Sequence, residues 1–283
     1  MFLSGQAIHD QCHWNLDDRY PIRRWSLPSQ VRDGDRVFVK VRDIPSFVAT
    51  PPPARVDLVV HNSDETFTEA MYEYVRPVVR TVYAVNCQSQ RATSLPLGFR
   101  DHQYTSHDAI HDVLREPQPE RTILCLVNFS LATNPPARTH AFRHFRDAPF
   151  ATVQDYATYP KPFAFSDPET VQRRIDFYRT LRATRFAICP AGTGYDTHRV
   201  YECIVFGVIP VVLTSPLDSL YARFPVWIAR SWSDVTEESM RSCAIRPDPS
   251  SVVDFKMPWE RTARHLSTRL RAGYPHSTQE HLS

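Results

Sequence analysis

Glycine and lysine are both scarce in this chain. Only seven of its 283 residues are glycine, and lysine is far rarer than arginine. Because so few glycines are present, their positions are informative. Gly192, Gly194 and Gly207 lie together in one short stretch. The sequence therefore predicts a tight backbone turn there, or a close approach between the backbone and another group.

Several classes of protein are excluded by motifs that the sequence lacks. No two of the six cysteines have the C-x-x-C spacing of a zinc ribbon or a thioredoxin-type site. No Walker A motif and no G-x-S-x-G motif occurs. The formal net charge is only +2, and no stripe of basic and aromatic residues is present. We therefore expect no nucleic-acid partner.

The signals of export and membrane insertion are also missing. The first residues show no basic start followed by an apolar stretch, so we expect no signal peptide. The longest apolar run, from Cys203 to Leu213, is about half the length that a membrane span needs. The scattered cysteines are typical of reduced thiols. We therefore expect a cytoplasmic protein without a membrane span.

The length and the order of elements predict two α/β domains. A chain of this length suits two domains of roughly 100–150 residues, and the proline-containing stretch 116–120 is the expected boundary. Strand and helix patterns alternate on both sides of it, as in layers built on parallel sheets. We expect one domain at 1–118, a second at 119–257, and a C-terminal helix at 258–283 that crosses back to the first domain.

In the first domain the patterns predict a hairpin followed by an α/β series. Asp33-Gly34 is a turn signal followed by strict alternation, which predicts a hairpin over 31–40. The rest of 1–50 is expected to be irregular. The other expected elements are a strand from Val56, a helix within 69–79, strands at 81–86 and 94–99, and a helix at 107–116.

In the second domain a buried strand is expected at 122–130, followed by a long irregular stretch to about residue 168. The pattern then predicts a helix and a strand-helix-strand unit. The expected elements are a helix at 169–182, a strand at 186–189, a helix at 196–206 and a strand at 209–213.

The glycine-containing stretch connects the strand at 186–189 to the helix at 196–206. Gly192 and Gly194 have no Cβ, so the backbone can turn sharply and a ligand can approach it closely. Thr193 or Asp196 is expected to cap the helix. The N–H groups of a helix start favour an anion by about 0.3–1 kcal/mol.

Arg199 and Glu202 lie three residues apart on that helix and add a cation and a carboxylate. Open α/β sheets hold nucleotides at this end of their strands. The alternative is a plain strand-turn-helix in which the glycines serve only the turn and Arg199 pairs with Glu202 at the surface.

The order of these residues resembles the donor-binding segment of exostosin-like glycosyltransferases. The family pattern reads roughly F-x-L-x-P-x-G, then a serine- or aspartate-threonine-arginine step, then E-x-x-x-x-G-x-I-P-V. The matching positions here are Phe186, Ile188, Pro190, Gly192, Asp196, Thr197, Arg199, Glu202, Gly207, Ile209, Pro210 and Val211. The specific part of the resemblance covers Arg185–Leu213, and weaker similarity extends to strands of the first domain.

The resemblance implies an inverting, metal-independent glycosyltransferase of the GT-B architecture, in which two Rossmann-like domains face each other across a cleft. Such an enzyme would move a sugar from a nucleoside-diphosphate donor, most simply a uridine diphosphate (UDP) sugar, to a glycan hydroxyl. The donor is then a substrate, and no cofactor or metal is required.

The resemblance also implies roles for individual residues. Glu202 would bind the ribose hydroxyls, Arg199 the base or the diphosphate, and the Gly192–Gly194 backbone the diphosphate. Arg138, expected in a loop after the strand at 122–130, would add a cation for the leaving phosphate, unless it is only a solvated loop residue. The expected donor-binding residues are Arg138, Gly192, Thr193, Gly194, Tyr195, Asp196, His198, Arg199 and Glu202.

An inverting transferase needs a base that accepts the proton of the acceptor hydroxyl. His61 and Asp64 follow a predicted strand of the first domain and are expected to face the cleft. Asp64 is the preferred base and His61 the second choice. Alternatively, Asp64 caps the next helix.

Two other functions remain compatible with the sequence. The chain could be a non-catalytic nucleotide- or glycan-binding module with the same fold. It could also be a metal-dependent glycosyltransferase that uses Asp33 and Asp35 as a D-x-D motif. That motif normally follows a nucleotide-binding βαβ unit, whereas here it precedes every such unit, so we expect no metal site.

Overall fold

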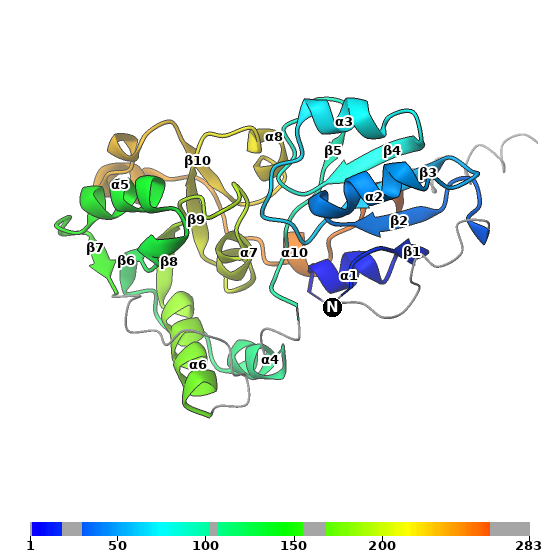
Figure 1. Cartoon of the computed structure of the whole chain (residues 1–283). Coiled ribbons are helices and arrows are strands. Elements are labelled where there is room, and N and C mark those ends of the chain that lie inside the picture. Colours follow the sequence, from blue (N-terminus) through cyan, green and yellow to red (C-terminus); the bar gives the residue numbers. More distant parts are fainter. Residues whose placement is uncertain (1, 19–29, 102–106, 155–167, 261–283) are drawn as a thin grey trace, which may run out of the picture.

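The computed structural model describes residues 2–18, 30–101, 107–154 and 168–260. The chain forms an α/β structure with two five-stranded sheets, and every strand pairing in both sheets is parallel. The two sheets lie in two lobes side by side (Figure 1). None of the helices in these residues has the length and apolar character required to cross a bilayer.

The first sheet has the strand order β1-β2-β3-β4-β5, which is also their order along the chain. Its strands are β1 (Trp14–Asn15), β2 (Arg36–Val39), β3 (Val56–Val60), β4 (Val79–Ala84) and β5 (Thr93–Ser94). All five residues of β3 are buried, because helices cover both faces of a parallel sheet. The helices of this lobe are α1 (Gly5–His9), α2 (Ile44–Ala49) and α3 (Glu69–Val75).

The second sheet has the order β10-β9-β8-β6-β7. Its strands are β6 (Ile123–Val127), β7 (Ala151–Val153), β8 (Thr184–Ile188), β9 (Ile209–Leu213) and β10 (Trp227–Ala229). The remaining helices are α4 (His107–Arg115), α5 (Pro135–Phe145), α6 (Pro168–Arg182), α7 (His198–Val205), α8 (Asp218–Tyr221), α9 (Glu237–Ser242) and α10 (Ser250–Val253).

The two lobes share one apolar core. A continuous cluster of buried side chains includes Leu97 and Phe99 of the first lobe together with Tyr178 and Tyr201 of the second. Two smaller clusters lie in one lobe each. One contains Phe47 of α2, and the other contains residues of α5 and α9. The lobes therefore do not fold around fully separate cores.

Most of the elements expected from the sequence are confirmed. The strand patterns correspond to β3, β4, β6, β8 and β9, and the helical patterns correspond to α3, α4, α6 and α7. These segments combine a clear period with buried apolar residues. Their ends differ from the expectation by a few residues, as helix and strand boundaries commonly do.

The hairpin expected at 31–40 is wrong. β2 pairs in parallel with β1 on one side and with β3 on the other, so the strand has no antiparallel partner. Asp33-Gly34 does form a turn, and Gly34 has a φ of 82°. This turn contacts the residue before β3, since the Gly34 N–H donates to Arg55 O at 2.9 Å.

Three expectations of irregular or extended chain are also wrong. The first 50 residues contain α1, β1 and α2 besides β2. The stretch after β6 contains α5 and β7, and its part at 155–167 lies outside the described residues. The strand expected at 94–99 is reduced to β5, while Phe99 forms one isolated bridge with Ser4. α5 begins with Asn134 as N-cap and Pro135 in its first turn, a start signal visible in the sequence.

The C-terminal helix expected at 258–283 lies outside the described residues from 261 onward. Trp259, just before that point, contacts the first lobe. Its indole N–H donates to Gln11 Oε1 at 2.8 Å, and its ring packs edge-on against Tyr83 of β4 with 5.1 Å between centroids. The chain has therefore returned from the second sheet to the first by residue 259.

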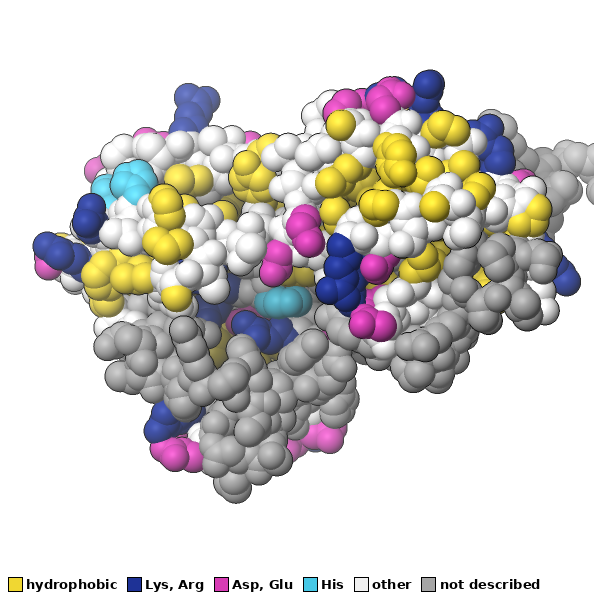
Figure 2. Space-filling view, viewed as in Figure 1, with side chains coloured by type: hydrophobic (Ala, Val, Ile, Leu, Met, Phe, Trp, Pro, Cys, Tyr) yellow, Lys and Arg dark blue, Asp and Glu magenta, His cyan; other side chains and the backbone are white. Residues whose placement is uncertain are grey.

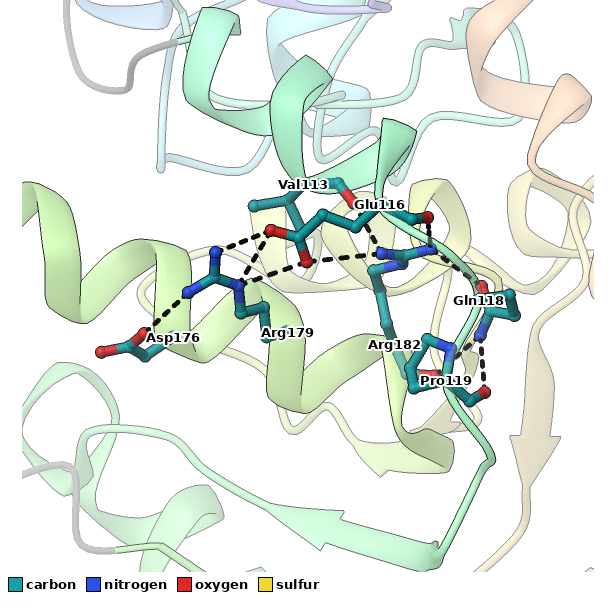
Figure 3. A network of polar contacts seen from close by, with 7 residues as sticks. All are labelled: Val113, Glu116, Gln118, Pro119, Asp176, Arg179 and Arg182. Carbon is teal, nitrogen blue, oxygen red and sulfur yellow. Dashed lines mark hydrogen bonds and ion pairs between the residues drawn. The ribbon is translucent and has the colours of Figure 1, made fainter.

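A polar network holds α4 against α6 (Figure 3). Arg182, at the end of α6, is buried and donates through Nη1 to Val113 O and through Nη2 to Glu116 O, both at 2.6 Å. Arg179 is half exposed and binds the Glu116 carboxylate. α4 precedes the boundary expected at residue 118, yet it packs on a helix that follows this boundary. The division of the chain at that residue stays a prediction.

We expect Arg182→Met to lower the free energy of unfolding by about 1–3 kcal/mol, because it leaves two carbonyl groups at the end of α4 without their donor. Arg179→Met is the matched control on the same helix, and we expect it to change stability little, because surface ion pairs contribute little. Urea unfolding at neutral pH measures both variants. Equal losses would contradict the role given to Arg182.

Candidate functional site

The second sheet contains a reversal of strand order. β6 lies between β7 and β8, so the chain moves to one side of β6 and then crosses to the other. Ligands of open α/β sheets bind outside the carboxyl ends of the strands at such a switch point. In the described part of the first sheet the strands follow one another without a reversal. The topology therefore directs attention to the loops after β6 and β8.

The loop after β8 contacts the first lobe, where Gly194 lies against Asn86. Figure 2 shows charged and histidine side chains in the hollow between the two lobes. The stretch between β8 and α7 contains Gly192 and Gly194, and the N-cap of α7 is Thr197. The loop after β6 begins with Asn128, which is buried. The expected donor-binding segment thus lies at the switch point.

The two glycines allow close contacts with other residues. A Cβ on Gly192 would lie 3.0 Å from Arg138 Nη2, and a Cβ on Gly194 would lie 2.5 Å from Asn86 Nδ2. The Gly192 N–H donates to Gly194 O at 3.0 Å, and Asn134 Nδ2 donates to Gly192 O at 2.8 Å. The loop is therefore fixed by contacts within the protein.

Arg138 lies in the first turns of α5, and its expected place in a loop is wrong. Its Nε donates to Ala191 O at 3.1 Å, and its Nη1 donates to Ser130 O at 2.8 Å. The guanidinium thereby joins the loop after β6 to the loop after β8. It adds positive charge next to Gly192.

Asp196 is a buried structural residue. Its carboxylate accepts four hydrogen bonds, from the backbone N–H groups of Leu97 and Thr197 and from the hydroxyls of Tyr201 and Tyr221, at 2.7–2.9 Å. Burial raises its pKa to about 6, and the hydrogen bonds oppose that rise. Neither Asp196 nor Thr193 caps α7 through its side chain, so that expectation is wrong. The Leu97 contact joins the loop before α7 to the first lobe.

Glu202 lies close to arginine side chains. Its carboxylate is 4% exposed, accepts from Arg199 Nε at 3.0 Å, and lies 3.8 Å from Arg100 Nε. Burial alone would raise its pKa, but the charges of Arg199, Arg100 and Arg174 outweigh burial and lower it. Arg199 and Arg100 thus bring positive charge directly to the Glu202 carboxylate at the switch point.

Arg199 has a fixed orientation. Its Nη1 donates to the backbone oxygen of Asn128 and lies 3.3 Å from the Asn128 side-chain oxygen. The guanidinium also stacks over the Phe177 ring of α6 at 4.3 Å, which is cation–π geometry. The side chain is only 17% exposed, so the simple surface pair with Glu202 is wrong.

His198 is a neutral residue at the start of α7. Its Nδ1 lies 2.8 Å from Gly98 O, and a carbonyl oxygen can only accept, so Nδ1 carries the proton. Burial lowers the pKa of His198 to about 4, and the charge of Arg100 acts in the same direction. At neutral pH its Nε2 therefore offers a lone pair.

Thr193 and Tyr195 are exposed at the tip of the loop. Thr193 Oγ1 donates to Thr133 O at 3.4 Å, and the Tyr195 side chain is 39% exposed. Deeper in, the buried Thr197 hydroxyl has no hydrogen-bond partner. A buried hydroxyl without a partner is uncommon in folded proteins.

The two candidate bases of the first lobe differ in accessibility. His61 is fully buried, with Nδ1 3.1 Å from Asn62 Oδ1 and Nε2 3.1 Å from Pro96 O. Asp64 is exposed and lines a cavity of about 400 Å³ at the carboxyl ends of β2 and β3. The other lining residues are Asp18, Lys40, Arg42, Asn62, Ser63 and Glu65.

Asp33 and Asp35 lie at the amino end of β2, whereas the cavity beside Asp64 lies at its carboxyl end. Asp33 accepts from the Arg55 N–H at 3.1 Å, and Asp35 accepts from the Trp14 indole at 2.9 Å. Within the described ranges, no group of three or more His, Cys, Asp or Glu side chains is arranged to hold a metal ion. Through the bonds to Arg55 and Trp14, the two carboxylates stabilise a turn of the first sheet.

Four residues of this region were not among the sequence candidates: Asn86, Arg100, Asn128 and Arg174. Asn86 and Asn128 each come directly after a buried strand pattern, and Arg100 follows the apolar stretch 95–99. Polar residues at strand ends are a usable signal, because parallel strands bring their carboxyl ends together. Arg174 lies on a helix with several arginines, and no pattern in the sequence distinguishes it from the others.

Comparisons with known proteins give no family assignment. No protein-family model matches the sequence, and no curated protein matches it significantly. The function therefore has to be inferred from the geometry and chemistry of the site itself.

We expect Tyr221→Phe to lower the free energy of unfolding at pH 7 by about 1.5–3 kcal/mol, because a buried carboxylate loses one of its donors. Tyr74→Phe is the control, since Tyr74 is 51% exposed and we expect it to change stability little. Thermal and urea unfolding measure both. If Tyr221→Phe left the free energy of unfolding unchanged, the Tyr221 hydroxyl would not stabilise the Asp196 carboxylate.

A second prediction concerns the pH dependence of stability. His198 has a pKa of about 4 in the folded chain and 6.5 in a model peptide, so it stabilises the fold above pH 6.5 and loses this effect as the pH falls toward 4. We expect the loss of stability caused by His198→Gln to shrink by about 2 kcal/mol from pH 7 to pH 4.5. Asp196 titrates in both proteins and cancels in the difference. A loss independent of pH would contradict the neutral state of His198.

Proposed function

We propose that the protein is an inverting glycosyltransferase of the two-domain GT-B type. It transfers a sugar from a UDP-sugar donor to a hydroxyl group of a glycan acceptor, without a metal ion. The donor binds to the second lobe between α7 and the loops after β6 and β8. The acceptor binds to the first lobe.

One observation carries this proposal: the buried Glu202 carboxylate, which accepts from Arg199 and lies 3.8 Å from Arg100, is at the switch point of the second sheet. Arg100, Arg174 and Arg199 come from three separate segments, and the charge of each lowers the pKa of Glu202. Positive charge at this place suits a diphosphate, and a buried carboxylate suits the paired hydroxyls of a ribose.

The neighbouring residues supply the other contacts that a nucleotide needs. The unused Thr197 hydroxyl can donate to a phosphate oxygen at the N-terminus of α7. Tyr195 presents an exposed ring on which a base or a sugar can stack. Arg138 adds a cation beside Gly192, where it helps to stabilise the leaving diphosphate.

The first lobe supplies the base. Asp64 opens into the cavity at the carboxyl ends of β2 and β3, whereas His61 is enclosed and both its nitrogens have partners. Asp64 therefore accepts the proton as the acceptor oxygen attacks the anomeric carbon. The bond from that carbon to the diphosphate oxygen breaks on the opposite face, which inverts the configuration. The departing diphosphate takes the electron pair of this bond, and the arginines stabilise its negative charge.

Calorimetry with UDP and with pyrophosphate tests the donor site. We expect Glu202→Gln to weaken UDP binding at least tenfold while pyrophosphate affinity stays the same or rises, because only the contact to ribose is lost. Arg100→Gln should weaken both ligands, since it removes a cation. Arg115→Gln is the matched control, because Arg115 is 77% exposed on α4.

Three results would change the assignment. Wild-type protein that binds neither ligand would refute the donor site. If Glu202→Gln weakened the binding of UDP and of pyrophosphate by the same factor, the contact between Glu202 and the ribose would be refuted. Binding of UDP without transfer or hydrolysis of any sugar in a panel of UDP-sugars would favour a non-catalytic module with the same fold.

A further inference from the structure

Asn86 occupies the point where the two lobes meet. It follows β4, is 1% exposed, and has a φ of 49°, in the left-handed region. Among residues other than glycine, asparagine is one of the few that adopt this conformation readily. Residues held in such a conformation by their surroundings are concentrated at functional sites.

The Asn86 side chain is bonded to both lobes. Its Oδ1 accepts from the Asp196 N–H at 2.8 Å, which fixes the end of the glycine-containing loop of the second lobe. Its Nδ2 donates to Ser63 O at 3.1 Å, which fixes the loop that carries Asp64 in the first lobe. One amide group thus connects the loop assigned to the donor with the loop assigned to the base.

Gly194 is shaped to receive this side chain. The three atoms nearest to a Cβ built on Gly194 all belong to Asn86: Nδ2 at 2.5 Å, Cγ at 2.9 Å and Oδ1 at 3.0 Å. A side chain at position 194 would therefore collide first with Asn86. The absence of a Cβ at this position therefore serves the contact with Asn86, and not only the turn.

We propose that Asn86 is a positioning residue that couples the Ser63–Asp64 loop to the Gly194–Asp196 loop. It sets the geometry between the base on one lobe and the donor on the other. This consequence for catalysis rests on the proposed function, whereas the coupling itself does not.

A double-mutant cycle tests the coupling. The four proteins are the wild type, Gly194→Ala, Asn86→Gly and the double variant, because Asn86→Gly removes the side chain and tolerates the left-handed backbone. We expect Gly194→Ala to raise the equilibrium constant of unfolding at least tenfold. When Asn86 is already glycine, we expect the same substitution to raise this constant much less. Additive effects in urea unfolding would overturn the proposal.

Ligand binding adds a readout that separates positioning from stability. We expect Gly194→Ala to weaken UDP binding about tenfold and Asn86→Gly in the same chain to restore most of the affinity, even though each substitution removes a native contact. If the wild type binds UDP but Asn86→Gly does not restore the affinity of the Gly194→Ala protein, the positioning role is overturned. If no variant binds UDP, the proposed function fails, and the unfolding cycle still decides whether the two loops are coupled.

Asn86→Asp separates the two hydrogen bonds. It keeps the acceptor for the Asp196 N–H but places an oxygen against Ser63 O. In hydrogen exchange of the full chain we expect faster exchange at 63–65 and little change at 194–197. Asn86→Gly should speed exchange in both segments, and it covers the case in which the aspartate variant does not fold. Unchanged exchange at both segments in Asn86→Gly would overturn the proposal.

Discussion

The arrangement of the two lobes depends on the buried carboxylate of Asp196. A buried charge is costly unless hydrogen bonds replace the water that it loses, and here two backbone N–H groups and two tyrosine hydroxyls do so. One of these donors, the Leu97 N–H, belongs to the first lobe. Satisfying the carboxylate therefore requires the lobes to meet in one geometry. The continuous apolar core around Phe99 and Tyr201 stabilises the same arrangement.

This constraint also fixes the residues of the candidate site. Gly194 contacts Asn86, and His198 donates to Gly98 O, so the loop before α7 is fixed by the first lobe. Arg199 is held by Asn128 and Phe177. A preorganised cluster loses little conformational freedom on binding. Its charges can also act on a leaving group without reorganising at the moment of reaction.

The fold was predicted best in segments where the spacing of apolar residues matched the side chains that are buried in the structure. β3 and β9 are short β-branched runs, and α7 follows a glycine turn, so local pattern was sufficient. The hairpin at 31–40 failed because a turn signal does not specify which strand the next segment joins. α5 was missed although Asn134 and Pro135 form a helix start, because its apolar period is weak. For the site, the motif selected Arg199 and Glu202, but it did not predict that Asp196 is buried and bonded to Leu97 of the first lobe.

The sequence alone determined the local character of the chain: parallel strands with buried residues, a glycine turn at 192–194, and a cation three residues before a carboxylate. These features follow from backbone sterics and from helical spacing, which act over a few residues. Only the tertiary structure decided that Arg100 lies beside Glu202 and that Asn86 fills the space beside Gly194. Those contacts link segments far apart in the chain, and their geometry depends on how two sheets pack around a shared core.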